Sequence, residues 1–353
     1  MANPVIKKLL GLVLALGAIG SASAADMHML PGAKPMISSG AAPDSPDNRI
    51  DPNLPSSRFS GVVSLAVQYD GGTFICSGTL VGKRQVVTAG HCVDTNNKGA
   101  LIDLKKPGSS VHVIFNATDS GPGSDIIRAS QVSMHADYNG FNYCPNGSRG
   151  CLNDDLAVVT LSKDAPANAK IYKVASGELQ AGTRIIMAGY GTSGDGVKGY
   201  YVDPDFFVKR SGQNYVDAFA SDDEKKGRHP EVWYADFDGN GIDTFCDWGV
   251  ACSPVLANDV EAGIGGGDSG GPSFVEMYGE LMLIATNTFG NSAGLTEGTF
   301  GTYFGGMVLK SYLDYLYQAT GGAVQFVPEP ASTAMFGLGL LALAGARRRK
   351  QLQ

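Results

Sequence analysis

The sequence has little charge and no excess of basic residues. Only 17% of its 353 residues are charged, and 27 basic residues stand against 34 acidic ones. Because nucleic-acid binding depends on a basic surface, this balance predicts no nucleic-acid partner. The sequence also lacks a Gly-X-Y period, which excludes a collagen-like chain, and its hydrophobic share of 43% is too high for a disordered one.

Glycine, in contrast, is abundant: the 48 glycines are about twice the usual share of roughly 7%. Glycine favours tight turns over long helices, which argues against an all-α fold. From residue 59 onward, Gly, Asn or Asp clusters separate short β-rich runs, a pattern typical of an all-β barrel or sandwich. One helix is predicted over 307–317, where apolar residues follow helical spacing ahead of two glycines. The β-rich runs are 62–67, 76–81, 85–88, 111–115, 155–161, 183–189 and 281–286.

Both ends of the chain are typical of targeting segments. Residues 1–24 combine a positive start, an apolar run and a small-residue cleavage site, which predicts a secretory signal peptide. Residues 25–49 are rich in Pro, Ser, Gly and Asp and predict a flexible leader or propeptide. Residues 327–353 contain Val-Pro-Glu-Pro, an apolar run and a basic cluster, which predict a short transmembrane segment. Without the six basic groups and one acid of the two ends, residues 25–326 carry 21 basic and 33 acidic groups, a net charge of −12.

The six cysteines suggest disulfides, because the chain is expected to be exported. Six cysteines allow 15 pairings, and the spacing in the sequence favours three local ones. A zinc site needs clustered ligands, whereas these cysteines are spread along the chain, so we expect no zinc. The favoured pairs are Cys76 with Cys92, Cys144 with Cys151, and Cys246 with Cys252.

Three short segments carry residues suited to acyl transfer. His91 follows the run 85–88, Asp155 stands at the start of an apolar run, and Ser269 lies in a glycine-dense loop. A serine hydroxyl needs a base to take its proton, histidine can do so near neutral pH, and a buried carboxylate orients the imidazole. Glycines around the serine let backbone N–H groups converge on a developing oxyanion. The pattern predicts nucleophilic catalysis by serine.

Over roughly residues 50–320, these segments resemble the chymotrypsin/trypsin family of serine endopeptidases. The resemblance implies an all-β fold of two six-stranded antiparallel β-barrels with a C-terminal helix, in a protease domain at 50–326 whose barrel boundary lies near residue 175. Residues 193–250 look least strand-like and are expected to be an insertion. The segments that carry the resemblance are Ala89-Gly90-His91-Cys92, Asp155-Leu156-Ala157 and Gly267-Asp268-Ser269-Gly270-Gly271-Pro272, in that order.

The C-terminal segment 327–353 resembles the PEP-CTERM sorting signal of Gram-negative bacteria. This implies processing by a dedicated sorting transpeptidase, with contact to the membrane through the tail before processing. A plain tail anchor is the alternative interpretation. Both place the protein outside the cytoplasm, in the cell envelope or the extracellular space.

The resemblance to serine endopeptidases assigns roles residue by residue. His91 would be the general base and acid, Asp155 the orienting carboxylate and Ser269 the nucleophile. The backbone N–H groups of Gly267 and Ser269 would form the oxyanion hole. Asp154 is the rival for the carboxylate, and Asp155 is preferred because the family's acid directly precedes a Leu/Ile-Ala-like pair. The expected activity is hydrolysis of peptide bonds in a protein or peptide substrate through an acyl-enzyme, with no required cofactor.

The same resemblance places the base of the specificity pocket at Gly263. An acid at that position would select Arg or Lys, so its absence predicts a preference for an apolar or small residue at the cleavage site. The segment Thr288-Phe289-Gly290 corresponds to the one that pairs with the substrate backbone.

A zymogen is also expected from the resemblance. Cleavage after Arg49 would free Ile50 to pair with Asp268 and so shape the oxyanion hole. The following residues Ile50-Asp51-Pro52-Asn53 depart from the family's Ile-Val-Gly-Gly. In the alternative interpretation, internal hydrogen bonds hold Asp268 and no cleavage is needed.

One further segment, 236–247, has the spacing of a calcium loop. A hard cation needs six or more oxygen ligands from a tight turn. The sequence has Asp rather than Glu at the twelfth position and no clear flanking helix, so a structural calcium ion and an Asp/Asn/Gly turn capped by its own side chains both fit. The calcium ligands would be Asp236, Asp238, Asn240, Ile242 and Asp247.

Two other functions fit the same residues less well. A catalytically silent envelope binding protein built on a protease fold would usually have lost a member of the triad, and all three are present here. An esterase would more often place Gly-x-Ser-x-Gly on a strand–helix elbow, which the all-β pattern and the order His, Asp, Ser argue against.

Overall fold

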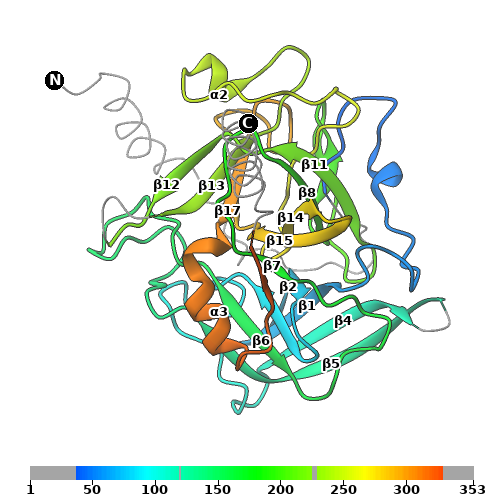
Figure 1. Ribbon diagram of the computed structural model, residues 1–353, viewed down its shortest axis with the longest axis vertical. Coiled ribbons are helices and arrows are strands. Elements are labelled where there is room, and N and C mark those ends of the chain that lie inside the picture. The colour runs from blue at the N-terminus through cyan, green and yellow to red at the C-terminus, as the bar shows by residue number, and fades with distance from the viewer. Residues whose placement is uncertain (1–36, 119–120, 225–228, 329–353) are drawn as a thin grey trace, which may run out of the picture.

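The computed structural model describes residues 37–118, 121–224 and 229–328, and the fold is all-β with a few short helices (Figure 1). Six antiparallel strands of the first half close a barrel in the order β1-β2-β3-β6-β5-β4. This barrel agrees with the prediction. Its strands are β1 (Val62–Tyr69), β2 (Gly72–Leu80), β3 (Gln85–Thr88), β4 (Ser110–Thr118), β5 (Gly121–Met134) and β6 (Ala157–Leu161).

The first hairpin shows why this sequence forms a barrel. Val63, Leu65 and Val67 alternate along β1 and are fully buried in the barrel interior, as expected of a strand whose successive side chains point to opposite faces. Asp70 and Gly71 then reverse the chain with φ values of 48° and 83°, the positive angles that a two-residue hairpin turn requires.

The second half differs from the expected closed barrel. Its strands form one sheet in the order β11-β8-β14-β15-β7-β18 and a second in the order β12-β13-β17-β16, with β9 and β10 as a separate pair. The short strand β7 runs parallel to both β15 and β18. The first sheet comprises β7 (Val174–Ala175), β8 (Arg184–Gly189), β11 (Arg210–Tyr215), β14 (Pro272–Met277), β15 (Glu280–Thr286) and β18 (Phe326–Val327); the other strands are β9 (Ser193–Asp195), β10 (Gly199–Val202), β12 (Ala218–Ser221), β13 (Pro230–Asp236), β16 (Phe289–Asn291) and β17 (Tyr303–Met307).

The segment 193–250 has more strands than its sequence suggested, because it supplies β9 to β13 of the second half. Strand β11 could not be recognised in the sequence because its buried residues include the polar Arg210 and Asn214. The amide of Asn214 donates to the carbonyl oxygens of Asp236 and Ala262, at 2.9 and 3.0 Å. Hydrogen-bonded polar side chains can thus replace the apolar residues that a buried strand normally shows.

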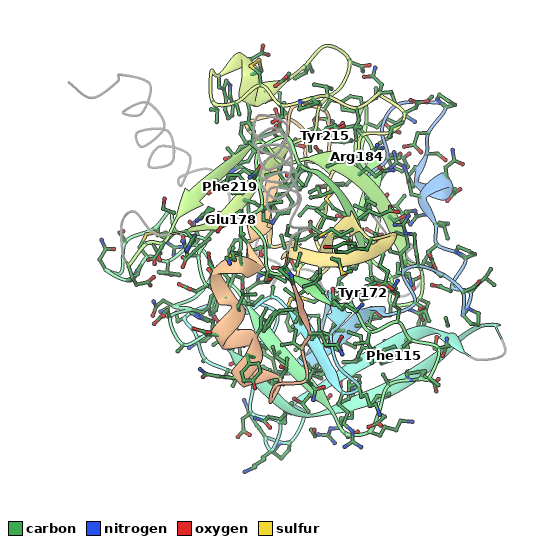
Figure 2. The ribbon with its side chains drawn as sticks, in the orientation of Figure 1. Phe115, Tyr172, Glu178, Arg184, Tyr215 and Phe219 are labelled. Atoms are coloured by element: carbon green, nitrogen blue, oxygen red, sulfur yellow. A yellow bond between two sulfur atoms is a disulfide. The ribbon has the colours of Figure 1, made fainter. Side chains whose placement is uncertain are left out.

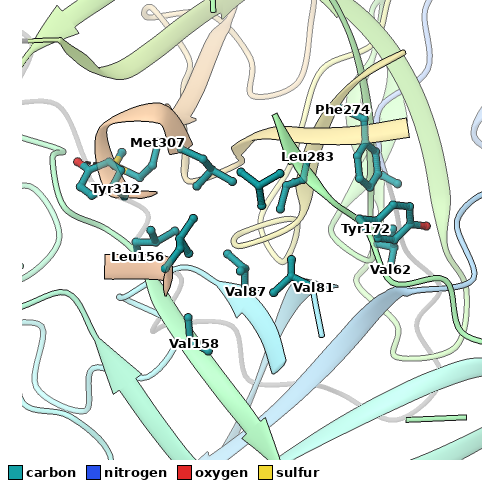
Figure 3. Close-up of a cluster of buried hydrophobic side chains, with 14 of the residues drawn as sticks. Val62, Val81, Val87, Leu156, Val158, Tyr172, Phe274, Leu283, Met307 and Tyr312 are labelled. Atoms are coloured by element: carbon teal, nitrogen blue, oxygen red, sulfur yellow. Dashed lines mark hydrogen bonds between the residues drawn. The ribbon is translucent and has the colours of Figure 1, made fainter. Parts of the chain in front are cut away.

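Three clusters of apolar side chains fill the protein. One occupies the barrel interior, one the second half, and the third lies where the halves meet. Figure 2 shows Phe115 in the lower half, Tyr172 at the junction and Tyr215 in the upper half. Figure 3 shows the junction cluster, in which residues of the first barrel face residues of the second half: Val62, Val81, Val87, Leu156 and Val158 against Tyr172, Phe274, Leu283, Met307 and Tyr312.

Short helices complete the fold. The predicted C-terminal helix forms as a 3-10 turn, η3 (Leu309–Tyr312), followed by α3 (Leu313–Ala319), while η2 (Pro46–Arg49) and α2 (Thr244–Asp247) are single turns. The buried residues Leu309, Tyr312 and Leu316 fix η3 and α3 to the junction cluster.

Both targeting segments lie outside the described residues, apart from Val327 and the residue after it at the start of the sorting tail. The signal peptide and residues 25–36 of the leader are not described, nor is the apolar run 331–346 of the predicted transmembrane segment. Within the three described ranges, no helix is both long and apolar enough to cross a membrane.

Candidate active site

His91 and Asp155 form a buried pair in the first barrel. His91 follows β3, and Asp155 lies two residues before β6, the strand that pairs with β3. One carboxylate oxygen of Asp155 lies 2.7 Å from Nδ1 of His91, and the other accepts the backbone N–H of His91 at 2.6 Å. Asp155 is 1% exposed. The carboxylate therefore fixes both the position of the histidine and the tautomer in which Nε2 can act as a base.

The two candidate aspartates face different histidines. Asp154 turns away from His91: its carboxylate lies 3.1 Å from Nδ1 of His135, and its backbone N–H donates to the Tyr312 hydroxyl at 3.0 Å. The left-handed backbone of Asp154, with φ of 61°, directs the two neighbouring side chains to different histidines. The arrangement matches the role predicted for Asp155.

Ser269 lies in the loop that precedes β14, in the second half. Its hydroxyl lies 3.5 Å from the carbonyl oxygen of Thr288, a weak contact. The backbone N–H groups of Asp268 and Gly270 donate to Gly265 and Asn287. Within the described residues, no acceptor is recorded for the N–H groups of Gly267 and Ser269. These are the two groups predicted to form the oxyanion hole.

Residues 265–271, which we call the nucleophile loop after the role predicted for Ser269, are attached to the first barrel. The backbone N–H of Ser77 donates to the carbonyl oxygen of Ser269 at 2.8 Å, and the Ser77 hydroxyl donates to that of Gly267 at 2.9 Å. Gly270 has φ of 78°, and a Cβ atom there would lie 2.2 Å from the Thr88 hydroxyl and 2.5 Å from the Ala89 nitrogen. Only glycine allows the loop to approach β3 this closely.

His91 and Ser269 line one cleft of about 580 Å³ between the two halves. The ring of Phe141 packs edge-on against His91, with ring centroids 5.2 Å apart. Gly263 also lines the cleft, and the Phe237 ring lies 3.3 Å from where a Cβ atom of Gly263 would be. Phe237 is a wall of the predicted specificity pocket that the sequence did not reveal, because it stands 26 residues from Gly263.

The segment Thr288-Phe289-Gly290 borders the same cleft. Strand β16 is the edge strand of its sheet, and it pairs with β17 on one side. A free strand edge can pair with an extended peptide. This is the role predicted for the segment.

Asp268 is fully buried behind the nucleophile. Its carboxylate accepts the backbone N–H groups of Gly191 and Gly265, at 2.8 and 2.9 Å. Burial raises the pKa of Asp268 to about 7, against the opposing effect of these hydrogen bonds and of the Arg210 charge. This is the internally hydrogen-bonded arrangement of the alternative interpretation.

The predicted activation residues Arg49 and Ile50 are not placed beside Asp268. Ile50 is 40% exposed and forms a β-bridge with Arg210. Ile37, which the sequence analysis did not single out, is fully buried, and its carbonyl oxygen accepts the Ser193 hydroxyl. The signal that could have found it is Ile37-Ser38-Ser39-Gly40, an Ile followed by small residues.

The predicted calcium ligands are only partly brought together. Asp236 and Asp238 lie with Asp243, a residue not predicted, so that one carboxylate oxygen of each is within 4.8 Å of the others. Of the other three predicted ligands, two already accept hydrogen bonds from the protein and one lies apart from the three aspartates. The side-chain oxygen of Asn240 accepts from Asn258, the carbonyl oxygen of Ile242 accepts the backbone N–H of Gly239, and Asp247 is exposed at the end of α2.

The three predicted disulfides form. Their Cα atoms are 6.2 Å apart in Cys76–Cys92, 4.9 Å in Cys144–Cys151 and 4.5 Å in Cys246–Cys252. The first joins the residue after His91 to β2, which also anchors the nucleophile loop.

Comparison with known proteins supports the resemblance. The trypsin family model matches residues 55–203, and the PEP-CTERM protein-sorting motif matches residues 326–350. The predicted likeness to a chymotrypsin/trypsin-like serine protease with a C-terminal sorting signal is thereby confirmed. The trypsin match includes His91 and Asp155 and ends before Ser269.

The individual relatives are distant. Serine protease 1 of Canis lupus familiaris is 24% identical over 155 residues, which are 43% of this chain and 54% of the relative. Serine protease 1 of Rattus norvegicus is 27% identical over 37% of this chain and 46% of the relative. Serine protease SP24D of Anopheles gambiae is 29% identical over 34% and 39%. The chain spans about half the length of the curated relatives it matches.

Among solved structures, HL collagenase aligns with a TM-score of 0.48 and 18% sequence identity, over 74% of this chain and 94% of its own.

Proposed function

We propose that this chain, with its trypsin-type domain and sorting motif, is a serine endopeptidase that cuts protein or peptide substrates through an acyl-enzyme on Ser269. The observation that supports this most is the single cleft that holds the His91–Asp155 pair and Ser269 beside two unused backbone N–H groups. Serine activation and oxyanion stabilisation need these groups together.

The proposed reaction has two halves. Nε2 of His91 takes the proton of Ser269 Oγ as this oxygen attacks the substrate carbonyl carbon, and the N–H groups of Gly267 and Ser269 donate to the oxyanion. The C–N bond then breaks, and His91 returns the proton to the leaving amine. Water, deprotonated by His91, then attacks the ester carbon; as the C–O bond to Ser269 breaks, His91 gives the proton to Ser269 Oγ and the acid is released. Asp155 stabilises the imidazolium in both halves.

Covalent labelling tests this proposal. A fluorophosphonate probe is expected to label the mature protein, and Ser269→Ala is expected to abolish labelling. Ser292 lines the same cleft but lies outside the nucleophile loop, so Ser292→Ala is the matched control and is expected to label at the wild-type rate. An unlabelled mature wild-type protein would favour a silent binding protein on this fold.

We propose further that the specificity pocket accepts apolar or small side chains. The Phe237 ring against Gly263 makes the base of the pocket apolar, and the cleft has the aromatic residues Tyr234, Phe289 and Phe304 on its walls. A peptide panel tests this preference. Cleavage strictly after Arg or Lys would contradict it.

For activation, we propose cleavage between residues 36 and 37 instead of after Arg49. Arg49 belongs to the 3-10 turn η2, and its guanidinium is held by Asp44 and by the carbonyl oxygens of Val260 and Glu261. A protease binds its cleavage site as an extended segment, whereas Arg49 lies in a 3-10 turn with its side chain bound to the protein.

The segment that begins at Ile37 has the contacts expected of a docked N-terminus. Ser38 bridges to Gly263 and Ser39 to Asp195, and the backbone N–H of Ser39 donates to Gly194 at 3.0 Å. The segment therefore lies along the same loops that hold Asp268. A freed ammonium at Ile37 would bring a positive charge to these loops and favour the ionised form of Asp268, whose pKa burial raises. N-terminal sequencing of the active protein is expected to begin at Ile37, and a start at Ile50 would refute the proposal.

We propose that the protein is exported to the envelope or surroundings of a Gram-negative cell and that a sorting transpeptidase processes the motif at 326–350. The disulfides agree with an oxidising compartment. Fractionation of cells that express the full chain and a chain ending at residue 326 tests this. Identical distribution of the two would contradict a role for the motif.

A further inference from the structure

Five carboxyl groups of the second half form one buried group, which we call the carboxylate cluster. It consists of Asp217, Asp236, Asp238, Asp243 and Glu261. All but Asp243 are between 0% and 6% exposed. Clustered carboxylates out of water repel one another, so the folded protein requires protons or a cation among them.

The cluster contains carboxylate oxygens without partners. Asp238 is 5% exposed, and its Oδ1 has no hydrogen-bond partner. Oδ1 of Asp236 and Oε1 of Glu261 are likewise buried without partners, although the other oxygen of each accepts a backbone N–H, from Phe245 and Leu256 respectively. Buried polar atoms in native proteins nearly always have hydrogen-bond partners. Three unpaired carboxylate oxygens in one place therefore indicate that a partner for them is missing.

Among the residues that the structure describes, the charged groups found to act on Asp238 are all carboxyls. They are the carboxyls of Asp236, Glu261, Asp243 and Asp217. The Arg49 guanidinium donates to the backbone carbonyl oxygen of Glu261 at 3.2 Å, but its positive charge is already paired with Asp44. No side chain recorded here supplies the missing positive charge.

We propose that the carboxylate cluster binds a calcium ion, with Asp236, Asp238 and Asp243 as its direct ligands and Glu261 beside them. The three ligand oxygens lie within 4.8 Å of one another. Oxygens on opposite sides of a calcium ion are about 4.6–5.2 Å apart, since calcium–oxygen distances are about 2.3–2.6 Å. A set of oxygen donors without His or Cys favours a hard cation over zinc or copper.

This site differs from the loop predicted from the sequence. In the linear loop, Asp247 closes the coordination from the twelfth position, whereas in the structure Asp243 joins the two early aspartates. Asp243 also caps α2, with its Oδ1 accepting the backbone N–H of Cys246 at 2.8 Å. Glu261 comes from the segment that leads to Gly263 and the nucleophile loop. Glu261 thus places the segment that leads to the nucleophile loop beside the proposed ion.

The position of the ion has a consequence for the cleft. Phe237 lies between the ligands Asp236 and Asp238, and its ring lines the cleft against Gly263. Calcium would therefore hold the wall of the specificity pocket in place. This part rests on the proposed protease function, whereas binding of the ion does not.

Calcium titration of the chelator-treated mature protein tests the site. Calorimetry is expected to show binding of one calcium ion per chain. At free calcium 100-fold above the dissociation constant, the thermal midpoint is expected to rise by roughly 5–10 °C. No binding heat and no change in midpoint would overturn the proposal.

Two isosteric variants identify the ligands. Asp238→Asn is expected to lose the calcium-dependent rise in thermal midpoint. Its midpoint in chelator is expected to equal or exceed that of the wild type, because one of the mutually repelling carboxylates is gone. Asp247→Asn, the matched control, is expected to keep the full rise. Equal loss in both variants would overturn the ligand set proposed here. Loss of peptide turnover with intact calcium binding would contradict only the proposed protease function.

Discussion

Replacing Asp155 by Asn tests the pairing at the centre of the proposed mechanism. Asn would keep an oxygen for the backbone N–H of His91, a contact of 2.6 Å, so the loop geometry is expected to survive. The amide nitrogen would replace the oxygen that lies 2.7 Å from Nδ1. An amide N–H donates, so Nδ1 would have to accept and the imidazole proton would move to Nε2. In that tautomer His91 cannot take the proton of Ser269.

The size of the effect follows from the burial of the pair. To recover the active tautomer, two N–H donors must face each other at a site where Asp155 is 1% exposed. Each unsatisfied buried donor costs about 1–3 kcal/mol. The barrier therefore rises by about 2–6 kcal/mol, a loss of roughly 30- to 30,000-fold in kcat. In trypsin-like proteases the corresponding change lowers kcat about 10⁴-fold, near the upper end of this range.

The assay is hydrolysis of an activated ester or peptide, with the rate of fluorophosphonate labelling as a second measure. Asp154→Asn is the matched control: it changes the neighbouring carboxylate, which faces His135, and Asn tolerates the left-handed backbone at this position. We expect the control to retain activity within about tenfold, which is about 1.4 kcal/mol on the barrier. Near-normal activity in Asp155→Asn, or an equal loss in Asp154→Asn, would refute the assignment.

Three further predictions concern stability. In chelator, the stability measured by thermal melts is expected to fall as the pH rises from about 4 to 9. Burial raises the pKa of Asp238 to about 9, so over this range the folded state binds a proton that the unfolded state has lost. Saturating calcium is expected to remove this dependence on pH. Gly270→Ala is expected to abolish activity and to cost at least about 1–3 kcal/mol in urea unfolding, given the positive φ at this position. Replacing Cys76 and Cys92 together by Ser is expected to cost about 3 kcal/mol in the same assay, and an unchanged midpoint would show that this bridge is energetically neutral.

The candidate catalytic residues can be recognised in the sequence because the chemistry proposed for them is local. An activated serine needs glycines beside it, so Ser269 is visible within a stretch of a few residues. Strand β1 is predictable for a similar reason, since Val63, Leu65 and Val67 alternate toward the interior. Neither inference depends on a distant partner.

What the sequence could not predict depends on contacts between distant segments. The buried Arg210 makes β11 look like a loop until its contacts with Pro46 and Asp47 are seen. The calcium loop was assigned in part to Asp247, because linear spacing cannot show that Glu261 comes close. The choice between Ile37 and Ile50 is of the same kind: which isoleucine is buried depends on loops more than 140 residues away.

Because the nucleophile loop is attached to β2, the candidate site is complete only when both halves have folded together. His91 and Asp155 are synthesised more than 100 residues before Ser269. The hydrogen bonds from the backbone N–H of Ser77 to Ser269 and from the Ser77 hydroxyl to Gly267 form only after the second half has folded against the barrel. A nascent or partly folded chain therefore has a base without an aligned nucleophile. Under the proposed function, this order of assembly keeps the chain from cutting proteins until both halves have folded.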